Sequence, residues 1–193
     1  MQNSPAIPKN SILGALELAL FMPKGIQRFN TDIKTALNSF LVPLAIMPLN
    51  FLALYYSHPH QKEIAHLPFA ETAGMFLVKG LFGFVLNVSV LYAFARGFNK
   101  TEHFWLVITA GHWSLILPTL LFTPLIFSLG LGWHSWEEIY NINIVFALYS
   151  YGLAAFILTY GFRIPWEMGG ALAIVFMAIN ETGFDVLYWL ASP

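Results

Sequence analysis

Long apolar stretches separated by short polar segments make up most of the chain. Five of these stretches reach about 20 residues or more, the length that an α-helix needs to cross the hydrocarbon core of a bilayer. A backbone that is exposed to lipid must satisfy its own hydrogen bonds, so each stretch is expected to be a helix. The pattern predicts an all-α fold, a polytopic membrane helical bundle with five transmembrane helices. The predicted spans are about 36–57, 73–95, 104–130, 140–162 and 168–190.

A shorter apolar run, residues 11–22, precedes the first span. It contains Glu17 and is followed by Pro23 and Gly25. The run is too short to cross a bilayer, and it lacks the small-residue cleavage pattern of a signal peptide. We therefore expect an N-terminal interfacial helix that lies on the membrane and is stopped by the proline and the glycine.

Local sequence signals refine the helices. Asn30 is expected to cap a helix that starts before the first span and runs into it. Prolines are expected to bend two spans, because proline removes a backbone hydrogen bond. Spans two and five carry small residues that would allow helix backbones to approach closely, although glycine is also simply common in membrane helices. These prolines and small residues are Pro43, Pro48, Pro118, Pro124, Gly80, Gly83, Gly169 and Ala173.

The connections between the last four spans are short, so these spans are expected to pack as consecutive antiparallel neighbours. Residues 1–193 then form a single membrane domain. Composition agrees with this class, since 58% of the residues are hydrophobic and only 10% are charged. A soluble domain carries about 25% charged residues. The net charge of −1 and the scattered basic residues exclude nucleic acid as a partner.

The distribution of lysine and arginine predicts the orientation. With the N-terminus inside, the cytoplasmic side carries far more of these residues than the outer side, as the positive-inside rule requires. The C-terminus is then outside. The inner set is Lys9, Lys24, Arg28, Lys34, Arg96, Lys100 and Arg163, against Lys62 outside.

Three charged residues lie within the predicted spans. From a rise of about 1.5 Å per residue, Lys79 lies roughly 9 Å below the outer boundary, Asp185 roughly 8 Å and Glu181 roughly 13 Å. Charges at this depth are costly and usually find partners. We expect Lys79 to pair with one or both acids and to tie span two to span five. Either this is a plain interhelical ion pair, or the cluster handles protons or an ion.

A second polar level is predicted nearer the inside, where Asn87 and His112 reach the same depth in spans two and three. A hydrogen bond between them is one interpretation, and a proton-carrying histidine is the other. Asn180, beside Glu181, would extend a polar seam between the two levels.

The predicted outer loops are rich in histidine and carboxylate, which are residue types that bind zinc or copper. Their spacing matches no defined metal motif, so we assign no metal site, and we expect no cofactor. The sequence also lacks the motifs HExxH and GxSxG and the Walker loop, so no catalytic residue is assigned and an enzyme is not expected. The weak metal candidates are His58, His60, His66, His134 and Glu137.

The segment "GIQRFNTDIKTALNSFLVPL" and the five-span layout with an inside N-terminus resemble the Yip1-type membrane proteins. The resemblance implies a fold of five spans and no catalytic residues. We expect a non-enzymatic multi-pass protein of a bacterial inner membrane that organises or assists the membrane or a partner complex. Its partners would be the lipid bilayer and either another membrane protein or a second copy of the chain. The alternative is a small transporter or channel component that uses Lys79, Glu181 and Asp185.

Overall fold

The structure is a computed structural model that describes residues 8–61 and 64–191, with side chains described as far as residue 182. Over this part of the chain the fold is helical and contains no strand, in agreement with the predicted all-α class. The helices are α1 (Ser11–Ala19), η1 (Pro23–Arg28), α2 (Ile33–Ser39), α3 (Leu41–Ser57), η2 (His58–His60), α4 (Phe69–Gly97), η3 (Thr101–His103), α5 (Phe104–Ser114), α6 (Ile116–Gly130), α7 (Trp136–Phe162) and α8 (Trp166–Ala191).

Four helical segments are long and apolar enough to cross a membrane, as expected for a membrane protein. They correspond to predicted spans one to four, and each begins a few residues before the predicted start, while the third and fourth end at the predicted residue. Predicted span five falls within α8, a helix of 26 residues whose last part lies beyond the described side chains, so its crossing stays a prediction. The four segments are Ile33–His60, Phe69–Gly97, Thr101–Gly130 and Trp136–Phe162.

Two of the four segments are broken by proline. Proline cannot donate a backbone hydrogen bond, and its ring clashes with the carbonyl four residues earlier. Four residues before Pro43 is Ser39, the last residue of α2, and four residues before Pro118 is Ser114, the last residue of α5. Pro48 and Pro124 lie inside α3 and α6 without ending them.

The residue that caps the N-terminus of α2 differs from the predicted one. Asp32, not Asn30, is the N-cap of α2, because its carboxylate accepts a 2.8 Å hydrogen bond from the Thr35 backbone N–H. An aspartate placed immediately before the first helical residue satisfies that exposed donor directly.

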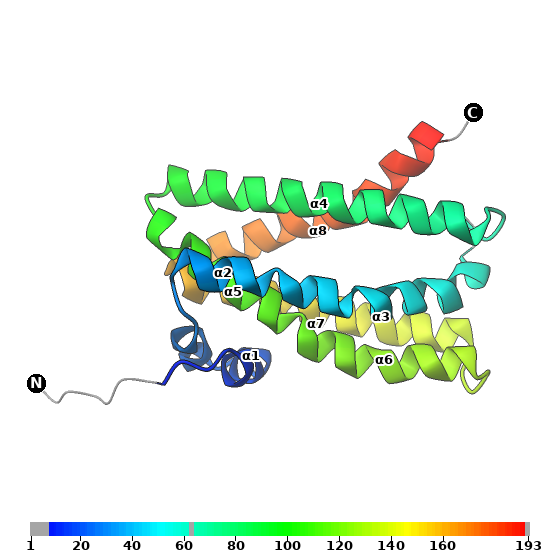
Figure 1. The fold of residues 1–193 in the computed structure, drawn as a ribbon, viewed down its shortest axis with the longest axis horizontal. Helices are drawn as coiled ribbons and strands as arrows, with labels where there is room; N and C mark the ends of the chain where they lie inside the picture. The colour runs from blue at the N-terminus through cyan, green and yellow to red at the C-terminus, as the bar shows by residue number, and fades with distance from the viewer. Residues whose placement is uncertain (1–7, 62–63, 192–193) are drawn as a thin grey trace, which may run out of the picture.

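By their contacts, α8 packs between α4 and α7, α7 packs against α5 and α6, and α3 packs against α6. Figure 1 shows these helices running along one common direction, with α4 at the upper edge and α6 at the lower edge. The closest approach is at Gly169 of α8, where an added Cβ would overlap the Thr159 hydroxyl oxygen and lie 2.9 Å from the Ala155 carbonyl oxygen of α7. The prediction of close approach is therefore right for Gly169. A Cβ at Gly80 would meet no atom within 4 Å, so that glycine lies at no helix contact.

The N-terminal helix is shorter than expected and lies across the bundle. Figure 1 shows α1 nearly end-on, while the long helices run across the view. α1 ends at Ala19, not at residue 22, because Phe21 adopts the left-handed conformation (φ 54°) and the Met22 backbone N–H closes a 2.9 Å bond to the Glu17 carbonyl. Met22 is extended, as expected for a residue that precedes proline.

Candidate functional site in the membrane helices

The predicted charged cluster falls on α4 and α8, which pack against each other. Lys79 is half-buried on α4. Glu181 is exposed on α8 and accepts a 2.9 Å hydrogen bond from the Tyr151 hydroxyl of α7. The side chain of Asp185 lies outside the described residues. The pairing of Lys79 with either acid stays a prediction, while the bond to Tyr151 links one acid to α7.

The predicted hydrogen bond between Asn87 and His112 is not formed. Each of the two side chains has another partner. The Asn87 amide donates to the Asn180 carbonyl oxygen across α4 and α8 at 3.1 Å. His112 Nδ1 pairs with the Ser39 hydroxyl of α2 at 2.9 Å. The bond between Ser39 and His112 therefore links the end of α2 to the end of α5, the two places where a proline interrupts a segment. Asn180 belongs to the polar seam through its bond with Asn87.

Asn87 and His112 nevertheless line the same space, here called the central cavity. It has a volume of about 420 Å³, and its wall is mostly apolar, with residues from α4, α5, α6, α7 and α8. Two buried polar atoms of wall residues, Asn87 Oδ1 and Ser114 Oγ, have no hydrogen-bond partner in the described part of the chain. Buried polar atoms are nearly always paired, so these two atoms require an explanation.

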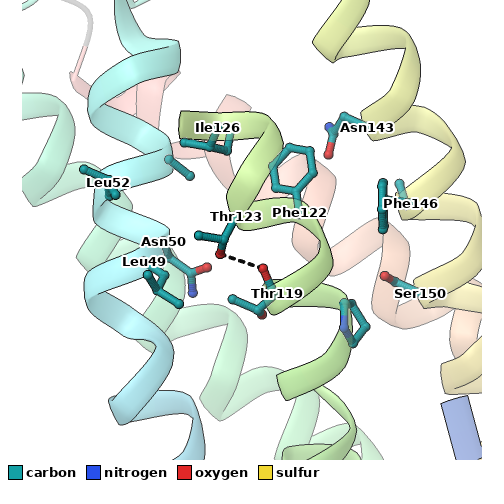
Figure 2. A pocket seen from close by; sticks show the side chains of 13 residues that line it. Leu49, Asn50, Leu52, Thr119, Phe122, Thr123, Ile126, Asn143, Phe146 and Ser150 are labelled. Carbon is teal, nitrogen blue, oxygen red and sulfur yellow. Dashed lines mark hydrogen bonds between the residues drawn. The ribbon is translucent and has the colours of Figure 1, made fainter. Parts of the chain in front are cut away.

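A second space, the outer cavity, has a volume of about 200 Å³ and lies between α3, α6 and α7. Figure 2 shows Asn50 of α3, Thr119 and Thr123 of α6 and Ser150 of α7 around it, with the Thr123 hydroxyl donating to the Thr119 carbonyl at 2.7 Å. Pro118, Thr119 and Ser150 line both cavities. The two cavities are therefore neighbours, separated at the start of α6.

An ion pair closes the N-terminal segment into a compact unit, here called the N-terminal unit (α1 and η1). Arg28 binds both oxygens of the buried Glu17 carboxylate, at 2.6 and 2.7 Å. The hydrogen bonds from Arg28 lower the pKa of Glu17, although its burial acts in the opposite direction. Lys24 lies 3.8 Å from the same carboxylate and adds to the lowering. Glu17 is thus held in its ionised form.

The N-terminal unit is docked on α7. The Tyr149 hydroxyl donates a 2.7 Å hydrogen bond to the Ala19 carbonyl at the end of α1. The ring of Phe21 packs edge-on against Tyr149 and Phe156, with centroid distances of 5.8 and 5.3 Å. These contacts offset the left-handed strain at Phe21, which costs about 1–2 kcal/mol. Tyr149 lies roughly midway along α7, so α1 reaches far along the bundle.

The other face of α1 is apolar and uncovered. Gly14, Ala15 and Leu18 face the protein, whereas the larger side chains on the opposite face are exposed. The exposed set is Ile12 (63% exposed), Leu13 (40%), Leu16 (43%) and Leu20 (71%). A helix with two apolar faces, one packed and one open, is suited to a lipid environment.

The histidines of the outer loops have structural contacts. His58 Nε2 lies 3.1 Å from the Thr72 hydroxyl, and the ring of His60 stacks on Trp136 at 5.8 Å. Within the described ranges no three histidine or carboxylate side chains are grouped so that they could hold a metal ion. His66, His134 and Glu137 are thus not brought together with them in such a group.

Several residues that build these sites escaped the sequence analysis. Tyr151, Ser39 and Ser114 lie in apolar stretches where a single hydroxyl does not interrupt the pattern. One sequence signal indicates the two serines. Each lies four residues before a proline, so its backbone carbonyl lacks the usual helical hydrogen bond. Arg28 lies 11 residues from Glu17, a separation that indicates no local pair, so the sequence shows only its contribution to the basic residues of the inner side.

No family model matches the chain, and neither a curated protein nor a solved structure matches it.

Proposed function

We propose that this is a non-enzymatic multi-pass membrane protein that organises the bilayer around it, with α1 as an interfacial helix inserted into one leaflet. The observation that carries the proposal is the docked N-terminal unit, which adds α1 and η1 to one half of the bundle. The open apolar face of α1 would then contact lipid, with Lys9 and Lys24 near the headgroups.

The two halves of α7 support this assignment. Between Leu153 and Phe162 most residues are buried, because α1, η1, α5 and α8 surround this half. Between Tyr140 and Leu148 the large side chains are mostly exposed. A bundle that is thicker in one half occupies unequal areas in the two leaflets, and this favours curved membrane. Under the predicted orientation, the thicker half lies in the inner leaflet of a bacterial inner membrane.

Curvature sorting tests the proposal. Fluorescently labelled protein is reconstituted into giant vesicles of phosphatidylethanolamine and phosphatidylglycerol, and its enrichment is measured on thin tethers relative to the flat membrane. Wild-type protein is expected to be enriched on tethers of one sign of curvature. The variant Ile12→Ser/Leu16→Ser makes the open face of α1 polar, and its enrichment is expected to fall at least about twofold.

The matched control is Leu81→Ser/Val85→Ser, which makes the same four-residue-spaced change on an exposed face of α4. This control should keep the wild-type enrichment. If wild-type protein distributes evenly between tether and vesicle, or if both double variants lose enrichment equally, the bilayer-organising role of α1 is refuted.

A second candidate function is a small transporter or channel component. It is favoured by the Tyr151–Glu181 hydrogen bond and by the two neighbouring cavities along a broken span. The prediction is an acid-dependent flux in proteoliposomes under a pH gradient that is lost in Glu181→Gln. Glu167→Gln, at the start of the same helix, should keep the flux. If vesicles that contain wild-type protein show no more flux than vesicles without protein, this function is refuted.

A further inference from the structure

Two asparagines of the outer cavity lie at the same depth in the predicted spans. Asn50 lies seven residues before the end of α3 at Ser57, and Asn143 lies seven residues after the start of α7 at Trp136. At a rise of about 1.5 Å per residue, each is roughly 10 Å from the predicted outer end of its helix. Figure 2 shows the two asparagines on the helices that flank α6. The cavity therefore has two amide groups at one level within the membrane.

Neither amide is satisfied by its own chain. Within the described ranges, no group forms a hydrogen bond with the side chain of Asn50 or Asn143. Both residues are exposed although they line the cavity, so the cavity is open to the surroundings of the bundle. An unpaired amide that faces hydrocarbon is costly, because lipid tails offer neither donors nor acceptors. The two asparagines therefore favour a polar partner from outside the chain.

An apolar cluster separates these amides from the outer surface. Ile126, Leu129 and Ile139 are at most 7% exposed and pack together near the outer ends of α6 and α7. Ala53 of α3 and Trp136 of α7 pack against this cluster on the outer side of the asparagines. Water from the outer surface is thus kept from the cavity, and lipid headgroups lie outside the hydrocarbon core. The partner that remains is a polar side chain on another membrane helix.

The hydrogen-bonding groups of the cavity are self-complementary. The hydroxyls of Thr119 and Thr123 donate to the carbonyls of Leu115 and Thr119 within α6, at 2.8 and 2.7 Å. Each hydroxyl has thus used its hydrogen and can only accept a further hydrogen bond. Each asparagine amide carries both donors and an acceptor. A second copy of the cavity therefore supplies donors for the threonines and amides that pair with amides.

The equal depth of the asparagines matches the symmetry of a membrane dimer. A twofold axis along the membrane normal brings residues of equal depth together, and the same surface of both chains forms the contact. Large side chains beside the amides are also uncovered. Tyr140 lies three residues before Asn143, on the same face of α7, and is 51% exposed.

We propose that the outer cavity is the contact surface for a second copy of this chain. Asn50 and Asn143 of each copy form hydrogen bonds with the amides and threonine hydroxyls of the other copy. The contact involves no residue of α1, so the proposal goes beyond the bilayer-organising function and does not depend on it.

Association in lipid bilayers tests the proposal. The chain contains no cysteine, so full-length protein is labelled through one cysteine placed before Met1. Subunits are counted by photobleaching in liposomes of phosphatidylethanolamine and phosphatidylglycerol over a range of protein-to-lipid ratios. Wild-type protein is expected to change from one subunit to two as the ratio rises. Asn50→Leu/Asn143→Leu is expected to raise the ratio at half-dimerisation at least about tenfold.

Asn141→Leu is the matched control. Asn141 is also exposed on α7, but two residues from Asn143 it points about 200° away around the helix. This variant should dimerise as wild type, and Asn50→Gln/Asn143→Gln should retain more association than the leucine pair. Ile12→Ser/Leu16→Ser should also dimerise as wild type. A failure of this proposal is thereby distinguished from a failure of the bilayer-organising function.

Crosslinking locates the contact and leaves both asparagines in place. Single cysteines replace Tyr140, on the face of Asn143, or Val145, which is 66% exposed on the opposite face of α7. With a short bismaleimide in bilayers, Tyr140→Cys is expected to form crosslinked dimer and Val145→Cys is not. This comparison decides the question even if Asn50→Leu/Asn143→Leu does not fold.

Three results in these assays would overturn the proposal: wild-type protein that stays monomeric at every ratio, equal weakening by Asn50→Leu/Asn143→Leu and Asn141→Leu, or equal crosslinking of the two cysteine variants. Labelling of Asn143→Cys by a membrane-impermeant maleimide would also overturn it. The cavity would then hold water, as the transporter function requires, and not a second copy of the chain.

Discussion

Replacing Gly169 with alanine is expected to lower the free energy of unfolding by roughly 1–2 kcal/mol. The new Cβ would overlap the Thr159 hydroxyl oxygen and lie 2.9 Å from the Ala155 carbonyl oxygen. The backbone of α7 cannot yield as a flexible side chain could, so α8 must move away from α7. The gain in helix propensity from glycine to alanine, at most about 1 kcal/mol, offsets only part of the cost.

The adjacent glycine supplies the control. A Cβ at Gly170 meets no atom within 4 Å, so Gly170→Ala is expected to leave stability unchanged or to raise it by up to about 1 kcal/mol. Both variants are compared by denaturant titration in mild detergent. Thr159→Ala in the Gly169→Ala background removes the overlap with the hydroxyl oxygen and should restore part of the lost stability. The recovery is incomplete because the close contact with the Ala155 carbonyl oxygen remains. Equal effects of the two glycine variants would show that α7 and α8 do not approach this closely.

Replacing Glu17 with glutamine is expected to loosen the N-terminal unit, because the ion pair between Glu17 and Arg28 holds α1 against η1. The change removes the charge from a carboxylate that is 7% exposed and bound through both oxygens by Arg28. Glutamine cannot accept both guanidinium bonds as an anion does. Hydrogen exchange of the backbone amides in residues 11–28 is expected to accelerate roughly tenfold, while exchange in α7 changes little.

Acid should have the same effect on the wild-type protein. Because the folded pKa of Glu17 is lower than its ordinary value, the ion pair stabilises the unit fully above the unfolded pKa of about 4.3. That stabilisation is lost as the pH falls through the lower, folded pKa. Exchange in residues 11–28, corrected for the intrinsic pH dependence, should therefore rise below pH 4 in wild-type protein and stay level in Glu17→Gln.

Asp32 also has a lowered pKa, caused by hydrogen bonds from Thr35, and provides the control for the acid experiment. Asp32→Asn keeps a side chain that can cap α2 but removes the titrating group. The acid response of residues 11–28 should persist in this variant. An acid response that vanishes in Asp32→Asn, or that survives in Glu17→Gln, would assign the effect to a group other than Glu17.

The sequence located the helices well because their signal is local. An apolar stretch of spanning length must be helical in lipid, and this requirement depends on no other part of the chain. The effect of proline is also local, so a bend was predicted near Pro43 and Pro118. Whether a proline ends a helix or is tolerated within it depends on the packing around it, and the sequence therefore did not separate these two prolines from Pro48 and Pro124.

The partners of polar side chains could not be read from depth alone. Asn87 and His112 reach the same level, yet the rotation of each helix about its axis turns Asn87 toward Asn180 and His112 toward Ser39. Depth follows from counting residues along one helix, but rotation is set by the packing of all its neighbours. The same reason explains why Tyr151 was not recognised as the partner of Glu181.

The sequence by itself determined the helical class of this protein, the positions of four segments long and apolar enough to cross a membrane, and the places where proline interrupts them. These features follow from composition and backbone chemistry. Only the tertiary structure decided which faces meet. It brought Arg28 to Glu17, closed α8 onto α7 at Gly169 and left a cavity beside Ser114. Each of these results requires two separate segments of the chain to meet in one orientation, which no local pattern specifies.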